Sequence, residues 1–188
     1  MGRFFFIGGI MIYYKSERLR IRSMREEDAQ IIYDTYLSYN WHPNIETYRN
    51  YFAENQNGRR ITFCGEMDGN LAGHVSLILK PEPDWLGPFR DQKMPLVSDF
   101  SVFYDYHRQG IGTKLMDVLE AEAIKYSDRI CLAVGCHWGY GTAQRMYVKR
   151  GYIPDGSGVW WNGKRHEQYA PCVNDDELLL WMYKDLSV

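Results

Sequence analysis

The sequence is poor in cysteine and lacks the cysteine spacings that metal sites use. Among its 188 residues are four cysteines, none in a C-x-x-C pair or in a cluster with histidine at zinc-ligand spacing: Cys64, Cys131, Cys136 and Cys172. Two of them lie in an apolar run, where a buried thiol behaves as a small hydrophobic group. We therefore expect reduced cysteines, no metal ion and a reducing, cytoplasmic compartment.

Long apolar runs are also missing. The opening stretch has Arg3 followed by an apolar run from Phe4 to Ile12, far short of the roughly 20 residues that span a bilayer. No small-x-small cleavage site follows it, so we expect neither a secretory signal nor a membrane partner. Residues 1–14 are interpreted as an N-terminal apolar extension or a first strand. Translation starts at either Met1 or Met11, and the sequence leaves this open.

The chain has no strong excess of either charge. Its 22 basic and 24 acidic side chains give a net charge of -2, which argues against a general nucleic-acid binder. One helical face carries Arg145, Lys149 and Arg150, but such a face is more often simply solvated. We expect no nucleic-acid partner.

What is present fits a globular enzyme of ordinary composition. The apolar share of 45% and the charged share of 24% are near globular averages. The length suits one compact domain, which we place at residues 15–188 after the 1–14 segment.

The first half of the chain predicts a strand, two helices and a hairpin. After a strand near residues 18–22, Ser23 and Glu26 form a capping-box pattern that predicts a helix start. One face of that helix would carry Ala29, Ile32, Tyr33, Tyr36 and Leu37. A second helix runs to Asn57-Gly58, strands at 61–66 and 71–79 form a hairpin, and a proline-rich surface loop covers 81–95.

The second half predicts a strand, a helix and a parallel strand at residues 96–104, 110–126 and 129–136, which form a βαβ unit. Thr142 can cap a further helix that Arg150-Gly151 stops, and two late strands lie near 157–161 and 177–183. In the strand predicted at residues 96–104, Phe100 and Val102 face one side of the sheet and Asp99 and Ser101 face the other.

A glycine-rich junction lies between that strand and its helix, where residues 104–114 read YDYHRQGIGTK. Unpaired amides at a helix start, the helix dipole and glycine together suit a phosphate group. A dinucleotide fingerprint would need a third glycine at Leu115, and a P-loop would need Gly-Lys-Ser/Thr, so both nucleotide interpretations fail. A glycine turn that only tightens packing remains the alternative.

This junction resembles motif A of the GNAT acetyltransferase superfamily, written Q/R-x-x-G-x-G/A, with His107 at its first position. A second segment, A-x-x-M-Y-x-K-x-G-Y at residues 143–152, is similar to the family's A-x-x-L-Y-x-K-x-G-F. The resemblance covers nearly everything from Lys15 onward. It implies an α/β (α+β) fold with a mixed, mostly antiparallel sheet, a central βαβ unit and helices on both faces. Three residues depart from the pattern: His107, Tyr152 in place of Phe, and Tyr140 where Asn is common.

The resemblance implies an acetyl-CoA-dependent N-acetyltransferase in which an amine of a small molecule or peptide attacks the thioester directly. The residues it assigns to the co-substrate are Phe100, Ser101, Val102, Arg108, Gln109, Gly110, Ile111, Gly112, Thr113 and Tyr140. A non-catalytic acyl-CoA sensor or partner-binding module is the alternative. A homodimer is compatible with either.

The resemblance also assigns Tyr147 to the departing thiolate. An attacking ammonium must lose a proton, and the candidate bases are Asp99, Asp105 and His137. By the same analogy, the acceptor site would be lined by Trp41, His42, Trp160, Trp161 and Tyr169, with acidic residues 175–177 at its rim to suit a cationic amine. That these tryptophans are core residues is an equally good interpretation.

Overall fold

The computed structural model describes residues 5–7 and 10–187. Contacts divide the chain into two compact units. The first holds the described residues up to Leu79 together with Asp99–Glu122, and the second holds Lys80–Ser98 and the described residues from Ala123 onward. A single domain over 15–188 stays a prediction.

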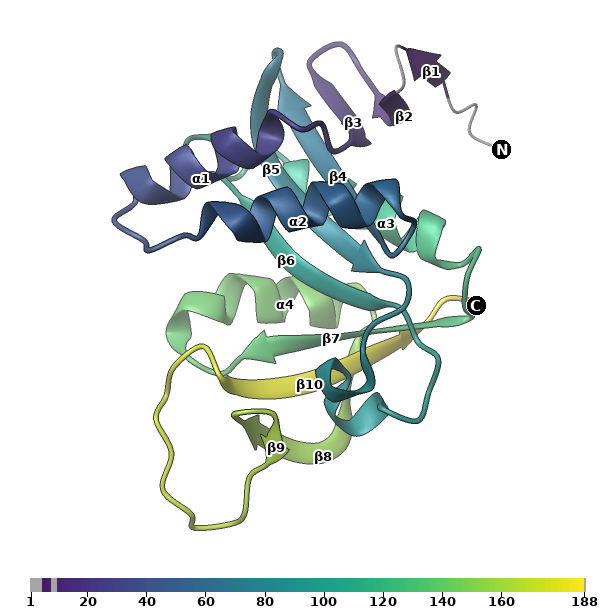
Figure 1. The fold of residues 1–188 in the computed structure, drawn as a ribbon. Coiled ribbons are helices and arrows are strands. Elements are labelled where there is room, and N and C mark those ends of the chain that lie inside the picture. Colours follow the sequence, from purple (N-terminus) through teal and green to yellow (C-terminus); the bar gives the residue numbers. More distant parts are fainter. Residues whose placement is uncertain (1–4, 8–9, 188) are drawn as a thin grey trace. The chain divides into compact units, whose positions relative to one another are not determined.

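The first unit is an antiparallel sheet with helices on both of its faces (Figure 1). Helices α1 and α2 cover one face, and α3 packs on the other, where Ile111 and Leu115 lie next to Gly65. In chain order its elements are β1 (Phe5–Ile7), β2 (Ile10–Lys15), β3 (Leu19–Ser23), α1 (Asp28–Ser38), α2 (Ile45–Gln56), β4 (Arg60–Met67), β5 (Asn70–Ile78), the end of β6 (Leu96–Val102), η3 (Tyr104–Tyr106) and most of α3 (Ile111–Ala123).

Of residues 1–14, those at 5–7 and 10–14 lie in strands β1 and β2, and β2 pairs antiparallel with β3. Residues 1–4 and 8–9, including the start at Met1 and Arg3, lie outside the described residues. The hairpin β4–β5 turns at Asp68 and Gly69, both with positive φ, as the sequence predicts.

The start of α1 differs from the prediction. Ser23 ends β3 and accepts a hydrogen bond from the Met11 amide, so it caps nothing. The helix begins at Asp28, whose carboxylate accepts from the Arg25 amide at 2.6 Å and from the Arg22 guanidinium at 2.6 and 2.8 Å. Arg22 also donates to Glu66 at 2.5 Å, and all three side chains are buried. An ion cluster therefore replaces the expected capping box.

Aromatic side chains fill the space between α1, α2 and the sheet. Ile32, Tyr36 and Tyr48 are buried there. Phe103, the residue that follows β6, is buried with them. The predicted apolar face of α1 is correct except for Leu37, which is 51% exposed because it lies on the solvent side of the last turn.

The second unit combines a parallel strand pair with antiparallel strands. The start of β6 runs parallel to β7, which confirms the parallel pair of the predicted βαβ unit, and β10 lies antiparallel between β7 and β8. Its elements are η1 (Pro83–Trp85), η2 (Gly87–Phe89), the start of β6, β7 (Arg129–Gly135), η4 (Trp138–Tyr140), α4 (Gly141–Lys149), β8 (Ile153–Trp161), β9 (Lys164–Arg165) and β10 (Leu178–Asp185).

Two predictions for this unit are wrong in detail. The proline-rich loop is not a surface loop throughout, because Leu86 and Phe89 are buried and the Phe89 ring contacts Trp181 edge-on. Thr142 does not cap α4: the helix already begins at Gly141 after Tyr140. Gly151, with φ of +88°, follows the helix end as expected. The mixed, mostly antiparallel architecture confirms the predicted fold class.

Candidate functional site

The glycine-rich junction forms a turn that leads straight into a helix. Arg108 and Gly110 both have left-handed backbones, with φ of +60° and +79°, and α3 begins at Ile111. The first amides of a helix have no partner within it, and they carry the positive end of its dipole. Ile111 is buried, so it offers a ligand only its backbone. We call residues 108–113 the cradle segment.

The two glycines of the cradle segment have different roles. A Cβ at Gly110 would meet nothing within 4 Å, so this glycine is required by its positive φ. A Cβ at Gly112 would lie 3.0 Å from the Phe100 ring and 3.3 Å from Val102. Gly112 therefore lets α3 approach β6 closely, which the sequence pattern alone did not reveal.

His107 departs from the family pattern, and its ring is turned toward the strand. Its Nε2 lies 2.8 Å from the Val102 carbonyl oxygen, so Nε2–H donates to the end of β6. This hydrogen bond links the turn before α3 to the end of β6.

Strand β6 presents its side chains as the alternation predicts. Phe100 and Val102 face α3, whereas Ser101 and Asp99 face the aromatic core under α1 and α2. Asp99 has φ of +47° in the middle of the strand. Left-handed backbone costs energy for any residue except glycine, and it is concentrated at functional sites.

The surroundings of Asp99 contain residues that the sequence did not single out. Its carboxylate lies 3.9 Å from Nδ1 of the buried His74, and it is 28% exposed. Burial, followed by the negative charge of Asp99, raises the pKa of Tyr36, Tyr48 and Tyr51, which we call the tyrosine cluster. The signal in the sequence that could have pointed to these residues is a histidine, His74, among the apolar residues of β5.

The buried histidine predicts a pH dependence of stability. Burial lowers the pKa of His74, so the unfolded chain takes up its proton before the folded one does. The contribution of neutral His74 to the free energy of unfolding is fully present above the unfolded-state pKa of about 6.5. As the pH drops below this value, the free energy of unfolding decreases by up to about 1.4 kcal/mol per pH unit. Urea unfolding at about pH 7.5 and pH 5.5 should show this loss, and His74→Asn should reduce it. An equal slope in both proteins would assign the loss to other groups.

His137 and Tyr140 lie in the second unit and share one acceptor. His137 Nδ1 accepts from the Gly139 amide at 3.1 Å, so its Nε2–H donates to Asp176 Oδ1 at 3.0 Å. The Tyr140 hydroxyl donates to the same oxygen, also at 3.0 Å. These hydrogen bonds, that of His137 first, lower the pKa of Asp176.

Tyr147 is a buried residue of α4. It is 6% exposed, and its ring contacts Tyr152 edge-on with centroids 5.6 Å apart. Burial raises the pKa of Tyr147. Full proton transfer to a thiolate is therefore less favourable than an ordinary phenol pKa suggests.

The residues expected around an acceptor amine are mostly at the surface. Trp41, His42 and Tyr169 are exposed, and Trp160 and Trp161 are half-buried, so none of the three tryptophans is a fully buried core residue. A hollow of about 320 Å³ in the second unit is lined by His137, Trp138, Asn174, Asp175 and Asp176. Trp138, which the sequence analysis did not select, is 94% exposed.

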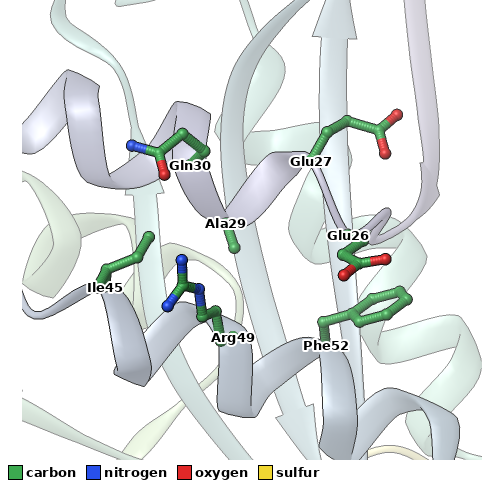
Figure 2. A pocket seen from close by; sticks show the side chains of 7 residues that line it. All are labelled: Glu26, Glu27, Ala29, Gln30, Ile45, Arg49 and Phe52. Atoms are coloured by element: carbon green, nitrogen blue, oxygen red, sulfur yellow. The ribbon is translucent and has the colours of Figure 1, made fainter.

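A larger hollow of about 500 Å³ lies between α1 and α2 (Figure 2). Its lining combines charged and apolar side chains: Glu26, Glu27, Ala29, Gln30, Ile45, Arg49 and Phe52. None of the residues selected from the sequence as co-substrate or catalytic candidates is among them.

Within the described residues, no helix is long and apolar enough to cross a membrane. The same residues contain no group of three or more His, Cys, Asp or Glu side chains arranged to hold a metal ion.

Among the solved structures that resemble the chain, three illustrate the likeness, all at low identity. The ribosomal-protein-S18-alanine N-acetyltransferase from Escherichia coli is 20% identical with a TM-score of 0.64, covering 90% of this chain and 95% of that one. A spermidine N-acetyltransferase chimera of SpeG from Vibrio cholerae and hSSAT is 14% identical with a TM-score of 0.64, covering 91% and 97%. The ribosomal L7/L12 alpha-N-protein acetyltransferase RimL, in complex with coenzyme A, is 12% identical with a TM-score of 0.66, covering 93% and 97%.

At these identities the structures establish the fold alone. No curated protein sequence matches the chain. The family comparison is more specific, since residues 21–152 match the acetyltransferase (GNAT) family from β3 to the residue before β8. Because that match extends over well over half of the sequence and contains both motifs, the chain belongs to the acetyltransferase (GNAT) family.

Proposed function

We propose that the protein is an N-acetyltransferase that transfers the acetyl group of acetyl-CoA directly to an amine of a small molecule or peptide. The family match supports the reaction class. The observation that carries the co-substrate assignment is the cradle segment, where α3 starts immediately after left-handed Gly110 and places the positive end of its dipole at this turn.

The cradle segment would hold the pyrophosphate of the co-substrate, chiefly through backbone amides. The exposed guanidinium of Arg108 adds positive charge beside it. The backbone of Phe100, Ser101 and Val102 would pair with the pantetheine arm, as a strand edge pairs with an extended ligand. One amide of this strand would stabilise the oxyanion that forms at the thioester carbonyl.

Asp99 is the base we favour. Asp105 lies exposed in η3, and both ring nitrogens of His137 are engaged in hydrogen bonds. Asp99 is partly exposed, and its backbone is strained. It would accept one proton from the acceptor ammonium. The amine nitrogen then bonds to the carbonyl carbon, the carbon–sulfur bond breaks, and the thiolate leaves with its electron pair. The nitrogen gives up its remaining extra proton, which the thiolate takes up, so that the products are the neutral amide and the free thiol.

Tyr147 would stabilise the departing thiolate with a hydrogen bond. Tyr147→Phe keeps the buried ring and removes the hydroxyl, so we expect kcat to fall by about 10²-fold or more, with little change in melting temperature or acetyl-CoA affinity. Single-turnover kinetics and calorimetry measure the three quantities. Unchanged turnover, with chemistry limiting the rate, would leave Tyr147 as a packing residue.

The cradle is tested by Gly112→Glu, which should abolish acetyl-CoA binding in calorimetry. A carboxylate beside the phosphates opposes binding electrostatically, and the side chain must also displace the Phe100 ring. Gly112→Ala is the matched control: it adds the Cβ contact without the charge and should retain measurable binding. If the Gly112→Glu variant binds acetyl-CoA as tightly as the parent protein does, the cradle assignment is wrong.

The decisive experiment for function is a screen of amines with acetyl-CoA that follows release of free thiol. The panel should contain simple monoamines, spermidine and short peptides with free N-termini. Turnover with any member supports the enzyme. Tight acetyl-CoA binding without turnover on the whole panel would instead favour the acyl-CoA sensor.

We also propose a reducing, cytoplasmic setting, which is consistent with the free, buried thiols of Cys64 and Cys131.

A further inference from the structure

A buried histidine lies directly behind the proposed base. His74 comes from the middle of β5 and is completely buried. The Tyr36 hydroxyl lies 2.8 Å from its Nε2, whereas its Nδ1 is buried without a hydrogen-bond partner. Leaving a buried polar atom unpaired is costly, so such an atom requires an explanation.

The unpaired nitrogen faces the Asp99 carboxylate. The separation of Nδ1 and Oδ2 is 3.9 Å, which is too long for a hydrogen bond but short enough for a small rotation of Asp99 to close. Catalytic hydrogen bonds are often long until the substrate binds. The left-handed backbone of Asp99 is a second, independent cost at the same point.

The hydrogen bond between Tyr36 and His74 can run in either direction, and its direction decides which ring nitrogen carries the proton. Burial raises the pKa of Tyr36, so its hydroxyl stays protonated and can donate to Nε2. When the hydroxyl donates to Nε2, the proton of a neutral imidazole lies on Nδ1, and the negative charge of Asp99 next to Nδ1 favours this tautomer. His74 stays neutral because burial lowers its pKa, and Arg60 from β4 acts in the same direction against Asp99 from β6 and Asp28 from α1.

We propose that His74 and Tyr36 are positioning residues for Asp99: Tyr36 holds His74 in its Nδ1–H tautomer, and this N–H orients the Asp99 carboxylate toward the acceptor amine. This inference rests on the proposed function, because it takes Asp99 as the base. Packing in the aromatic core does not by itself require a histidine at position 74 or a tyrosine at position 36. The proposal gives each of these two residues a role. The chain Tyr36–His74–Asp99 joins α1, β5 and β6 within the first unit.

Two substitutions of His74 separate positioning from packing. His74→Asn keeps an amide donor near the place of Nδ1 and loses the bond to Tyr36, whereas His74→Gln keeps a group near Nε2 and loses the donor toward Asp99. We expect Gln to lower kcat by about 10- to 100-fold, the worth of one hydrogen bond to a charged group, and Asn to lower it less. KM for acetyl-CoA should not change. If His74 is only a packing residue, the order is reversed, because Gln preserves the native bond to Tyr36.

A double-mutant comparison asks whether His74 acts through Asp99. In the Asp99→Asn background, adding His74→Gln should lower kcat no further, since the carboxylate that it orients is gone. Independent, multiplying losses would overturn the proposal. These rates use the amine of the panel that gives the fastest thiol release. Melting temperatures of all variants identify any that fail to fold.

The tautomer can be measured without any activity. Nitrogen-15 NMR of the histidine rings distinguishes Nδ1–H from Nε2–H, and we expect His74 to carry its proton on Nδ1. Tyr36→Phe should remove this preference. An Nε2–H tautomer in the parent protein would overturn the positioning role even if the enzyme is active. A protein with the expected tautomer but no turnover on any amine would instead overturn the proposed function, and the catalytic role of His74 with it.

Discussion

Asp99→Asn is expected to lower kcat by about 10²-fold or more, the usual contribution of a general base, while leaving acetyl-CoA affinity nearly unchanged. The reason is that Asn cannot accept the proton of the acceptor ammonium. Asn also tolerates the left-handed backbone that Asp99 adopts at φ of +47°. The charge is therefore removed without changing the strand, and stopped-flow thiol release measures the effect.

Two further variants make this result specific. Asp99→Gly removes the same carboxylate and relieves the backbone strain, so it should be as inactive as Asn yet at least as stable to heat. Asp105→Asn removes an exposed carboxylate from η3 and should turn over normally. If Asp105→Asn were the inactive variant and Asp99→Asn the active one, the proton acceptor would be Asp105.

The second large effect concerns stability. Asp28→Ala should lower the free energy of unfolding by about 3–5 kcal/mol, because it leaves the buried Arg22 guanidinium without one of its two carboxylate partners. The same change removes the acceptor of the Arg25 amide at the start of α1. Urea denaturation monitored by tryptophan fluorescence measures the loss.

An exposed ion pair of the same unit is the control. Arg18 and Asp68 pair at 2.6 Å, but more than half of each side chain is exposed to solvent. Arg18→Ala should therefore leave the urea midpoint almost unchanged, since water replaces the lost contact and the left-handed Asp68 of the hairpin turn is kept. Equal losses at both sites would mean that burial does not strengthen the cluster around Arg22.

Local chemistry predicted much of this protein because the relevant signals lie close together in the sequence. Asp68 and Gly69 prescribe the hairpin turn, the alternation of Phe100 and Val102 prescribes the faces of β6, and Gly110, just before α3, marks the strand-to-helix junction. The two ordered motifs led to the acetyltransferase family, and the family match confirms it.

Contacts between distant segments decided the rest. Nothing near Ser23 and Glu26 reveals that Asp28 will bind Arg22 in a buried cluster, because that depends on Glu66 from another strand. Similarly, His74 and Asp99 are 25 positions apart and meet only because β5 and β6 are neighbours in the sheet.

Burial and backbone strain are likewise properties of the folded chain. The raised pKa of Tyr147 comes from desolvation, which no sequence pattern measures. The left-handed backbone of Asp99 is held by the strands and helices around it, although nothing in the local sequence requires it. The sequence by itself thus determined the family and the position of the strand-to-helix junction, whereas tertiary packing decided which carboxylate is strained, partly exposed and next to a buried histidine.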